Sequence, residues 1–217
     1  MTAEVVPDDD AGRASAVRIL RAGGVVAMPT DTVYGIGVDL SVGGGIERLF
    51  EAKRRPADRA IMLLLADAGQ AAILADWPPA AAVLADAFWP GGLTLVLRQR
   101  HGMALPAELT GGRATIGLRV PDHPSPRALA AALGPLPVTS ANISGLPEAR
   151  TAAEILAQLG DAIDLVLDGG PSRGGPASTV VDCTVAQPRI LRGGAISPAA
   201  IVACLRSASL PEPNSTS

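Results

Sequence analysis

The sequence predicts a single-domain α/β protein with an open, twisted, mixed β-sheet flanked by helices. Short apolar runs alternate with segments of helical periodicity, which is typical of this class. Some neighbouring strand segments have no helix between them, which favours a mixed sheet over a purely parallel one. The 217 residues, 48% of them hydrophobic, suit one large domain. We expect a domain over residues 1–206 and a polar, disordered tail over 207–217.

Apolar spacing and terminal signals predict six helices. Gly23 and Gly24 end the first, Pro56 closes the segment after the second, and Thr151 caps the fifth with Glu154 placed for a capping box. Ser197 caps the last helix. The predicted ranges are 14–22, 46–54, 80–88, 125–133, 152–159 and 198–205.

Strands are predicted where short apolar runs are bounded by Gly, Pro or polar residues. Pro29 stops the first run, and residues 29–37 are predicted to form a turn-rich loop. A loop rich in Gly and Pro over 169–177 is expected to be mobile and to lie over a site. The predicted strands are 24–28, 61–65, 93–97, 115–120, 136–140, 165–167, 179–183 and 189–191.

Composition and motifs exclude several classes of function. The net charge of -3 requires any RNA-binding surface to be local. No phosphate-binding GxxxxGK[ST] loop and no GxSxG elbow occurs, and Cys183 and Cys204 stand outside any zinc-ligand pattern. The N-terminus does not resemble a secretory signal, and the longest apolar run is too short to span a bilayer. We therefore expect a cytoplasmic protein without a membrane partner and without a protein-held metal.

One candidate site lies on the predicted strand at 115–120. Thr115, Gly117 and Arg119 share one face because side chains alternate along a strand. That face offers a hydroxyl, a gap and a guanidinium, over which a ligand could lie. An ordinary half-solvated strand is the alternative.

A second candidate is the only lysine, which lies on the apolar stripe of its helix. Lys53, Arg55 and Arg59 could together hold a triphosphate. Alternatively, they form a basic helix end that interacts with the helix dipole. A third candidate, Ser140 with Asn142 and Ser144, follows a short strand, where open α/β sheets bind ligands; the alternative is a simple Asn-Ser turn.

Seven stretches in order resemble the YrdC-like family, and within it the threonylcarbamoyl-AMP synthases, over about residues 24–193. They are PTDTVYGIG from Pro29, KRRPADRA from Lys53, FWPGGLTLVL from Phe88, TIGLRVPDHP from Thr115, TSANISGLP from Thr139, ASTVVD from Ala177 and LRGG from Leu191. The resemblance implies the YrdC/RibB-like fold and the short form of the enzyme, which lacks an extra C-terminal domain.

The resemblance also implies roles for individual residues. Contacts to threonine are implied for Thr32, Arg119, Ser140 and Ser178. Contacts to ATP are implied for Arg55, Arg59, Thr115, Asn142, Arg150 and Arg192, with Lys53 and Arg55 acting in catalysis near the phosphates. Two positions depart from the family: Leu64 stands where some members have a threonine-contacting histidine, and Arg59 where many have an uncharged residue.

The implied reaction joins L-threonine, bicarbonate and ATP into threonylcarbamoyl-AMP and pyrophosphate, a step towards N6-threonylcarbamoyladenosine on tRNA. Such chemistry depends on positioning and on cations. Mg²⁺ is expected with ATP, held mainly by the phosphates. Implied partners are the threonylcarbamoyl-transferase proteins that use the intermediate, and tRNA. The alternatives are a double-stranded RNA- or tRNA-binding protein without synthase activity and, less favoured, a carbamoyl transferase.

Overall fold

The computed structural model describes residues 3–54, 60–103, 105–172 and 175–215. Its helices are α1 (Asp10–Arg21), α2 (Gly45–Lys53), α3 (Ala68–Leu74), α4 (Pro79–Phe88), α5 (Ala107–Thr110), α6 (Pro124–Leu133), α7 (Ala152–Leu159), the short η1 (Gly160–Ala162) and α8 (Pro198–Ser207). Its strands are β1 (Glu4–Pro7), β2 (Val26–Met28), β3 (Gly35–Gly37), β4 (Met62–Leu64), β5 (Leu93–Arg98), β6 (Thr115–Arg119), β7 (Leu136–Ser140), β8 (Leu165–Asp168), β9 (Thr179–Asp182), β10 (Arg189–Arg192) and β11 (Asn214–Ser215).

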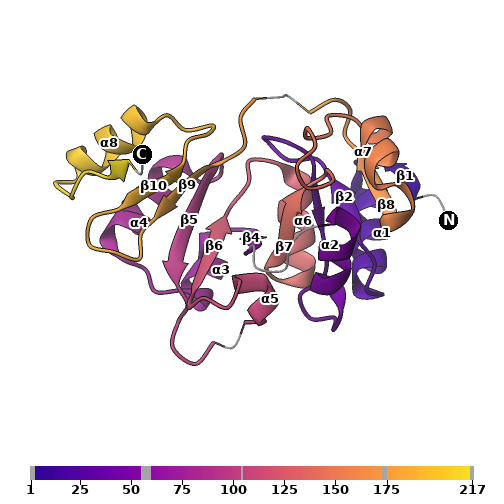
Figure 1. Cartoon of the computed structure of the whole chain (residues 1–217), viewed down its shortest axis with the longest axis horizontal. Helices are drawn as coiled ribbons and strands as arrows, with labels where there is room; N and C mark the ends of the chain where they lie inside the picture. Colours follow the sequence, from indigo (N-terminus) through magenta and orange to yellow (C-terminus); the bar gives the residue numbers. More distant parts are fainter. Residues whose placement is uncertain (1–2, 55–59, 104, 173–174, 216–217) are drawn as a thin grey trace.

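All described strands belong to one sheet, in the order β1-β8-β2-β3-β7-β4-β6-β5-β9-β10-β11. The sheet contains parallel pairs, such as β4 with β6 and β5 with β9, and antiparallel pairs, such as β3 with β7 and β5 with β6. The sheet runs across the whole molecule, with α1, α2 and α7 near the N-terminal end and α4 and α8 near the C-terminal end (Figure 1). The predicted open mixed sheet with flanking helices is confirmed.

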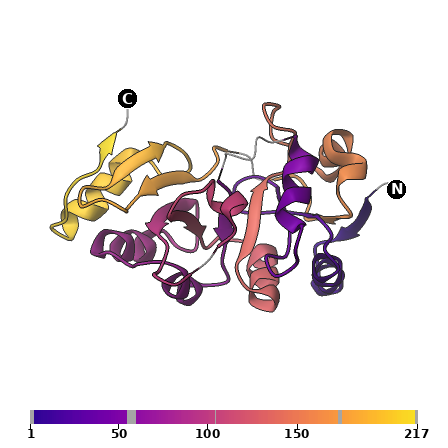
Figure 2. The same ribbon diagram turned by 60° about the horizontal axis from the view of Figure 1, so that its bottom comes forward.

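The two faces of the sheet are covered differently. Near the N-terminal end, Ala16 and Leu20 of α1 and Leu129 of α6 pack against one face, together with alternate residues of β2, β7 and β8. The opposite face packs against α2 and α7 there, and against α4 and α8 near the other end. Near the N-terminal end, α2 and α7 lie on one side of the strands and α1 and α6 lie on the other (Figure 2). The face that carries α1 and α6 continues onto β6, β5 and β9, where it holds the cavity described below.

The predicted elements are present, with shifted ends. The ranges predicted for α7 and β7 agree with the structure. The first helix begins at Asp10, four residues earlier than predicted, because Asp9 caps it by accepting a hydrogen bond from the Gly12 amide at 2.8 Å. Ser197 caps α8 as predicted.

The predicted loop over residues 29–37 contains a strand, β3, and that part of the prediction was wrong. A Cβ atom on Gly35 or Gly37 would lie 2.6 or 2.9 Å from the Val138 side chain. The two glycines therefore let β3 approach β7 closely. With Ile36 as its only residue that has a side chain, β3 is too short to show an alternating pattern. The sequence also gave no prediction of β1, α3 or α5.

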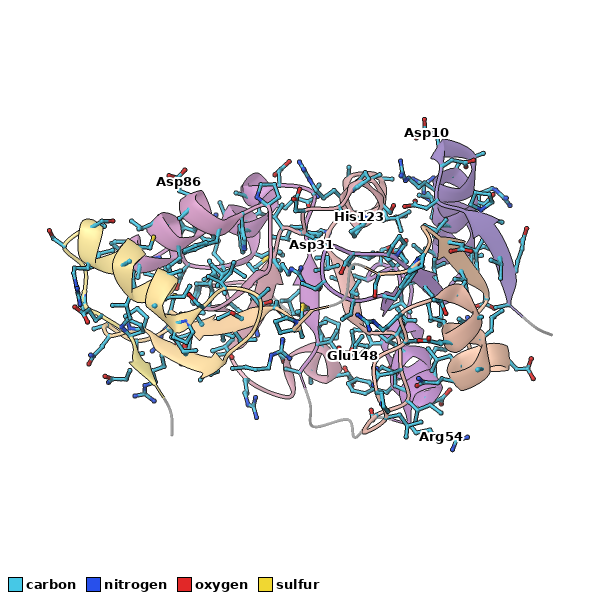
Figure 3. The ribbon with its side chains drawn as sticks, turned by 90° about the horizontal axis from the view of Figure 1, so that it is seen from above. Asp10, Asp31, Arg54, Asp86, His123 and Glu148 are labelled. Atoms are coloured by element: carbon cyan, nitrogen blue, oxygen red, sulfur yellow. The ribbon has the colours of Figure 1, made fainter. Side chains whose placement is uncertain are left out.

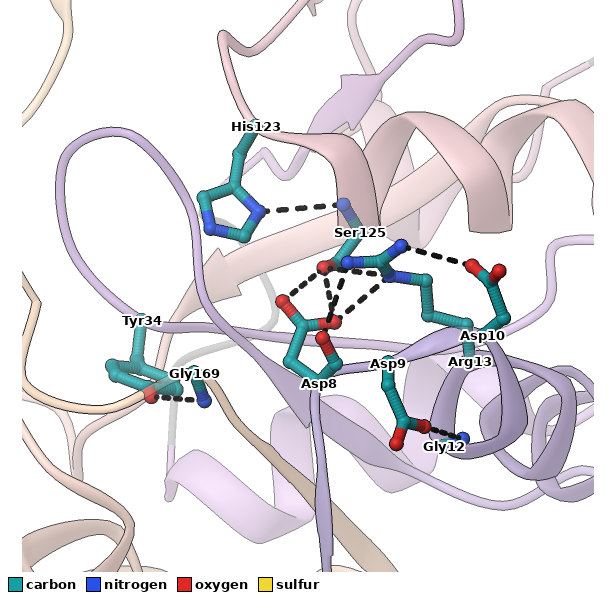
Figure 4. A network of polar contacts seen from close by, with 9 residues as sticks. All are labelled: Asp8, Asp9, Asp10, Gly12, Arg13, Tyr34, His123, Ser125 and Gly169. Carbon is teal, nitrogen blue, oxygen red and sulfur yellow. Dashed lines mark hydrogen bonds and ion pairs between the residues drawn. The ribbon is translucent and has the colours of Figure 1, made fainter.

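A buried carboxylate attaches the N-terminal strand to the rest of the fold. Asp8 accepts hydrogen bonds from Arg13 Nε at 2.9 Å and from Ser125 Oγ, at the start of α6, at 2.5 Å (Figure 4). His123 accepts from the Ser125 amide at 3.3 Å and caps α6. This network joins β1, α1 and α6 and involves no residue of the candidate site.

The described part of the tail, which the sequence predicts to be disordered, folds back along the sheet. Asn214 and Ser215 pair in parallel with β10, and the Asn214 amide donates to the Pro188 carbonyl at 2.9 Å. Leu210 packs partly buried against the core. The contacts of this segment come from one apolar side chain and a backbone ladder. The domain boundary at 206 and the disorder of 207–217 stay predictions. No helix in the described parts is long and apolar enough to cross a membrane.

Candidate active site

A cavity of about 330 Å³ lies on the sheet face that α1 and α6 leave open. Residues that lie beside one another on neighbouring strands form its floor. Leu64 of β4 lies beside Arg119 of β6, and Val96 of β5 lies beside Gly117. Thr94 lies beside Val180 of β9. Alternation thus places Thr115, Gly117 and Arg119 towards the cavity, as the sequence predicts.

Arg119 is held from three directions at the inner end of the cavity. Its Nη2 donates to Asp31 Oδ1 at 2.6 Å, its Nη1 to Thr32 Oγ1 at 3.1 Å and its Nε to the Gly91 carbonyl at 2.9 Å. The Arg119 and Asp31 side chains are only 5% and 10% exposed. Burial lowers the pKa of Arg119, and the carboxylate of Asp31 opposes that shift. A guanidinium has five N–H groups, so one on each Nη atom is left for an anionic ligand.

Ser178, directly before β9, and Arg192, the last residue of β10, form a second polar cluster. Arg192 donates from Nε and Nη2 to the Ser178 carbonyl, at 3.2 and 2.8 Å, and from Nη2 to Ser178 Oγ at 3.1 Å. Thr94 Oγ1 lies 2.8 Å from Ser178 Oγ. The positive charges of Arg119 and Arg192 are close enough for Arg192 to contribute to the lowered pKa of Arg119. The cavity therefore presents two neighbouring cations to a ligand.

The segment after β7 is organised by a buried lysine. Lys53 is 1% exposed, and its Nζ donates to the carbonyls of Ser140 and Asn142 and to Asn142 Oδ1, the last two at 2.6 and 3.1 Å. The side-chain Nδ2 of Asn142 donates to the Leu146 carbonyl at 2.7 Å, and Ser140 Oγ donates to Asn142 Oδ1 at 2.6 Å. Lys53 thus points inward, as its place on the apolar stripe predicts, but its described contacts are to protein oxygens.

Six of the predicted site residues line the cavity: Thr32, Thr115, Arg119, Ser140, Ser178 and Arg192. Lys53, Asn142 and Arg150 do not. The first two support the segment beneath Ser140. Arg150 is exposed, and its carbonyl accepts from the Ser172 amide at 2.8 Å. Arg55 and Arg59 lie outside the described residues.

Among the lining and supporting residues that were not predicted are Asp31, Thr94, Arg113 and Glu148. Asp31 and Glu148 lie near the middle of the molecule, whereas Asp10 and Asp86 lie at its periphery (Figure 3). Arg113 is exposed and lines the cavity. It is separated from Thr115 by one residue, so the alternation that identified Thr115 and Arg119 was a signal for Arg113 too.

The start of the connection between β8 and β9 is fixed by a buried tyrosine. Tyr34 Oη donates to the Gly170 carbonyl at 2.7 Å. It also accepts from the Gly169 amide at 3.1 Å, and this second bond is drawn in Figure 4. Burial raises the pKa of Tyr34, a shift that the Gly169 bond opposes. Ala177 and Ser178, at the other end of the connection, line the cavity. The connection therefore borders the site at both ends, and its expected mobility stays a prediction.

The described lining residues include neither cysteine nor histidine. Cys183 is buried, and burial raises the pKa of its thiol to about 12. No group of three or more His, Cys, Asp or Glu side chains in the described ranges is arranged to hold a metal ion. Glu148 is the carboxylate of the described lining. The described lining therefore offers mainly hydroxyl and guanidinium groups as its polar groups.

Comparison with known proteins identifies the family. The Sua5/YciO/YrdC family model, described as telomere recombination, matches residues 18–194. This chain belongs to that family. A Mycobacterium leprae relative is 41% identical over 92% of this chain and 90% of its own length. The Bacillus subtilis threonylcarbamoyl-AMP synthase is 39% identical over 85% of this chain.

Solved structures of family members share the fold. Pyrococcus abyssi Sua5, solved in complex with L-threonine, superposes with a TM-score of 0.86 at 33% identity over 98% of this chain. This chain spans 62% of that protein and 54% of the Bacillus subtilis enzyme.

Proposed function

We propose that this protein is an L-threonylcarbamoyladenylate synthase, a nucleotidyltransferase that converts L-threonine, bicarbonate and ATP into threonylcarbamoyl-AMP and pyrophosphate. One observation carries the proposal. The residues implied by the family resemblance to contact threonine, Thr32, Arg119, Ser140 and Ser178, come from four distant stretches of sequence and meet in one cavity. A relative with the same fold binds L-threonine.

The cavity supplies what the chemistry requires. The amine of threonine captures carbon dioxide, derived from bicarbonate, to form an N-carboxylate and release a proton. An oxygen of that carboxylate then attacks the α-phosphorus of ATP, and the bond to pyrophosphate breaks. Neither step needs an enzyme nucleophile, so the protein acts by positioning and by stabilising negative charge.

Individual residues have distinct roles in this scheme. Arg119, fixed by Asp31 and Thr32, is placed to bind the carboxylate of threonine with its two remaining N–H groups. Arg192 is placed to neutralise charge on the phosphates, with Thr115 as a hydroxyl contact to the nucleotide. Lys53 positions Ser140 from beneath rather than contacting ATP through its described bonds.

Mg²⁺ is proposed as the companion of ATP, where it would neutralise phosphate charge. The donor set fits an ion held mainly by phosphate oxygens and water, because Glu148 is the carboxylate that the described lining offers. The reaction is proposed to take place in the cytoplasm, where tRNA and the threonylcarbamoyl-transferase proteins would use the product.

Pyrophosphate release tests the proposal. Purified protein with ATP and Mg²⁺ should release pyrophosphate only when both threonine and bicarbonate are present. Arg192→Gln, which keeps a hydrogen-bonding amide but removes the charge, should slow release strongly. Release that is independent of threonine would count against the synthase.

RNA binding without synthase activity is the competing function, since arginines gather at the cavity. A gel-shift titration with tRNA separates the two. Phosphate-driven binding weakens steeply as salt is raised. Salt-sensitive tRNA binding by protein that makes no adenylate would favour the RNA-binding function.

A further inference from the structure

A buried threonine lies behind the two polar clusters of the cavity. Thr94, on β5, is 2% exposed, and its Oγ1 lies 2.8 Å from Ser178 Oγ and 3.8 Å from Met62 Sδ. Ser178 is itself 1% exposed. The Thr94 hydroxyl therefore has two neighbours, a strong hydrogen-bonding hydroxyl and a weakly accepting sulfur.

The direction of the Ser178 hydroxyl follows from its other partner. A guanidinium can only donate, so Ser178 Oγ accepts from Arg192 Nη2. If Thr94 donates to Ser178 as well, both acceptor positions of Ser178 Oγ are filled, and its own proton points to the cavity. If Thr94 instead donates to Met62, it accepts the Ser178 proton, which then points away from the cavity.

An anionic ligand selects between these two arrangements. A carboxylate in the cavity is stabilised by a hydroxyl that donates to it, and hydrogen bonds to charged groups are the strong ones. We propose that Thr94 is a positioning residue that turns the Ser178 hydroxyl towards the carboxylate of the amino-acid substrate. This rests on the proposed function for the identity of that substrate.

The geometry predicts an effect on one substrate and not on the other. Arg192 is anchored mainly by the Ser178 carbonyl, through two hydrogen bonds that do not involve Thr94. Loss of the Thr94 hydroxyl should therefore disturb the Ser178 proton but leave Arg192 in place. Affinity for threonine should fall while affinity for ATP stays nearly constant.

Three substitutions separate orientation from packing. Thr94→Val puts a methyl group where the hydroxyl lies. That methyl carbon would be 2.8 Å from Ser178 Oγ, which is shorter than a van der Waals contact, so the variant also crowds Ser178. Thr94→Ala removes the hydroxyl without crowding. Thr94→Ser keeps the hydroxyl. We expect the dissociation constant and the KM for threonine to rise roughly tenfold in the first two variants and to stay within about twofold in the third.

A matched control lies on the opposite face of the neighbouring strand. Thr179 is also fully buried, and its Oγ1 donates to the Ile196 carbonyl at 2.6 Å. Thr179→Val removes a buried hydroxyl bond outside the cavity. It should lower thermal stability and leave the ratio of the two KM values unchanged.

Calorimetric titration of threonine without ATP, followed by steady-state kinetics with both substrates, decides the question. Equal threonine affinity in wild type and in folded Thr94→Ala would overturn the role of Thr94, as would a parallel rise in both KM values. Absence of threonine binding by the wild type would instead overturn the proposed function. Thermal melting of each variant identifies those that fail to fold.

Discussion

The buried ion pair between Arg119 and Asp31 gives the sharpest prediction of stability. Asp31→Asn keeps the size of the side chain and an oxygen that can still accept from Arg119 Nη2, but it removes the negative charge. Both side chains are at most 10% exposed, so water and salt screen the remaining positive charge poorly. The perturbation therefore isolates the charge of one partner.

The magnitude follows from the burial of the pair. Removing one partner of a buried pair generally costs about 3–5 kcal/mol, because the other charge is left uncompensated. Asparagine retains one hydrogen bond, so we expect the lower end, about 3 kcal/mol of unfolding free energy. Replacing both residues, in the double variant Asp31→Asn with Arg119→Met, should recover part of this loss because neither charge of the pair then remains.

Urea unfolding at neutral pH measures the effect, and an exposed pair supplies the control. Arg206 and Glu212 bond at 2.9 Å with side chains 69% and 50% exposed. Glu212→Gln should change the unfolding free energy by less than about 1 kcal/mol. Two results would refute the reasoning. One is a loss of unfolding free energy in Asp31→Asn as small as in the control. The other is a double variant that is less stable than Asp31→Asn, because Arg119→Met should recover stability once Asp31 is already replaced.

Three further predictions concern single residues. Lys53→Met should lower the unfolding free energy by about 3 kcal/mol in urea, because it strips two carbonyls and Asn142 Oδ1 of a buried donor; a change below about 0.5 kcal/mol would contradict this. Arg113→Ala should raise the KM for ATP roughly tenfold at unchanged melting temperature, whereas Arg18→Ala on distant α1 should change neither. An ATP KM equal to that of the wild type would show that Arg113 does not contact ATP. Burial raises the pKa of Cys183 from 9.0 to about 12. The buried neutral thiol therefore contributes fully to stability below pH 9, and this contribution is lost as the pH rises towards 12. Relative to Cys183→Ala, wild-type unfolding free energy should fall by about 1.4 kcal/mol per pH unit in that window, and parallel pH profiles would show that the thiol is not buried.

Local sequence signals predicted much of the fold because most elements have their own apolar pattern and their own residues that mark where they begin and end. The helix that starts after Thr151 has a cap, an apolar stripe and a following glycine, and its range agrees with the structure. By contrast, β3 consists of Gly35, Ile36 and Gly37, whose strand character comes from pairing with β2 and β7. Such pairing is a tertiary effect that no local pattern carries.

The candidate site was predictable where strand alternation alone decides it. The cavity-facing positions of Thr115 and Arg119 follow from the alternation of side chains along a strand. The same rule would have placed Arg113 on that face. The partner of a buried side chain is harder to predict. The inward position of Lys53 was expected, but only the fold shows that β7 and its following turn supply the oxygens that it meets. Asp31 and Thr94 act through Arg119 and Ser178, far away in sequence, and so gave no local signal.

The central claim is that the cavity joins threonine, bicarbonate and ATP in one product. The most direct test incubates the wild-type protein with ATP, Mg²⁺, threonine and isotopically labelled bicarbonate, and analyses the products by mass spectrometry. The account predicts a threonylcarbamoyl-AMP ion that carries the label and is absent when threonine is omitted. Folded protein that binds ATP and threonine but forms no labelled adenylate would contradict it.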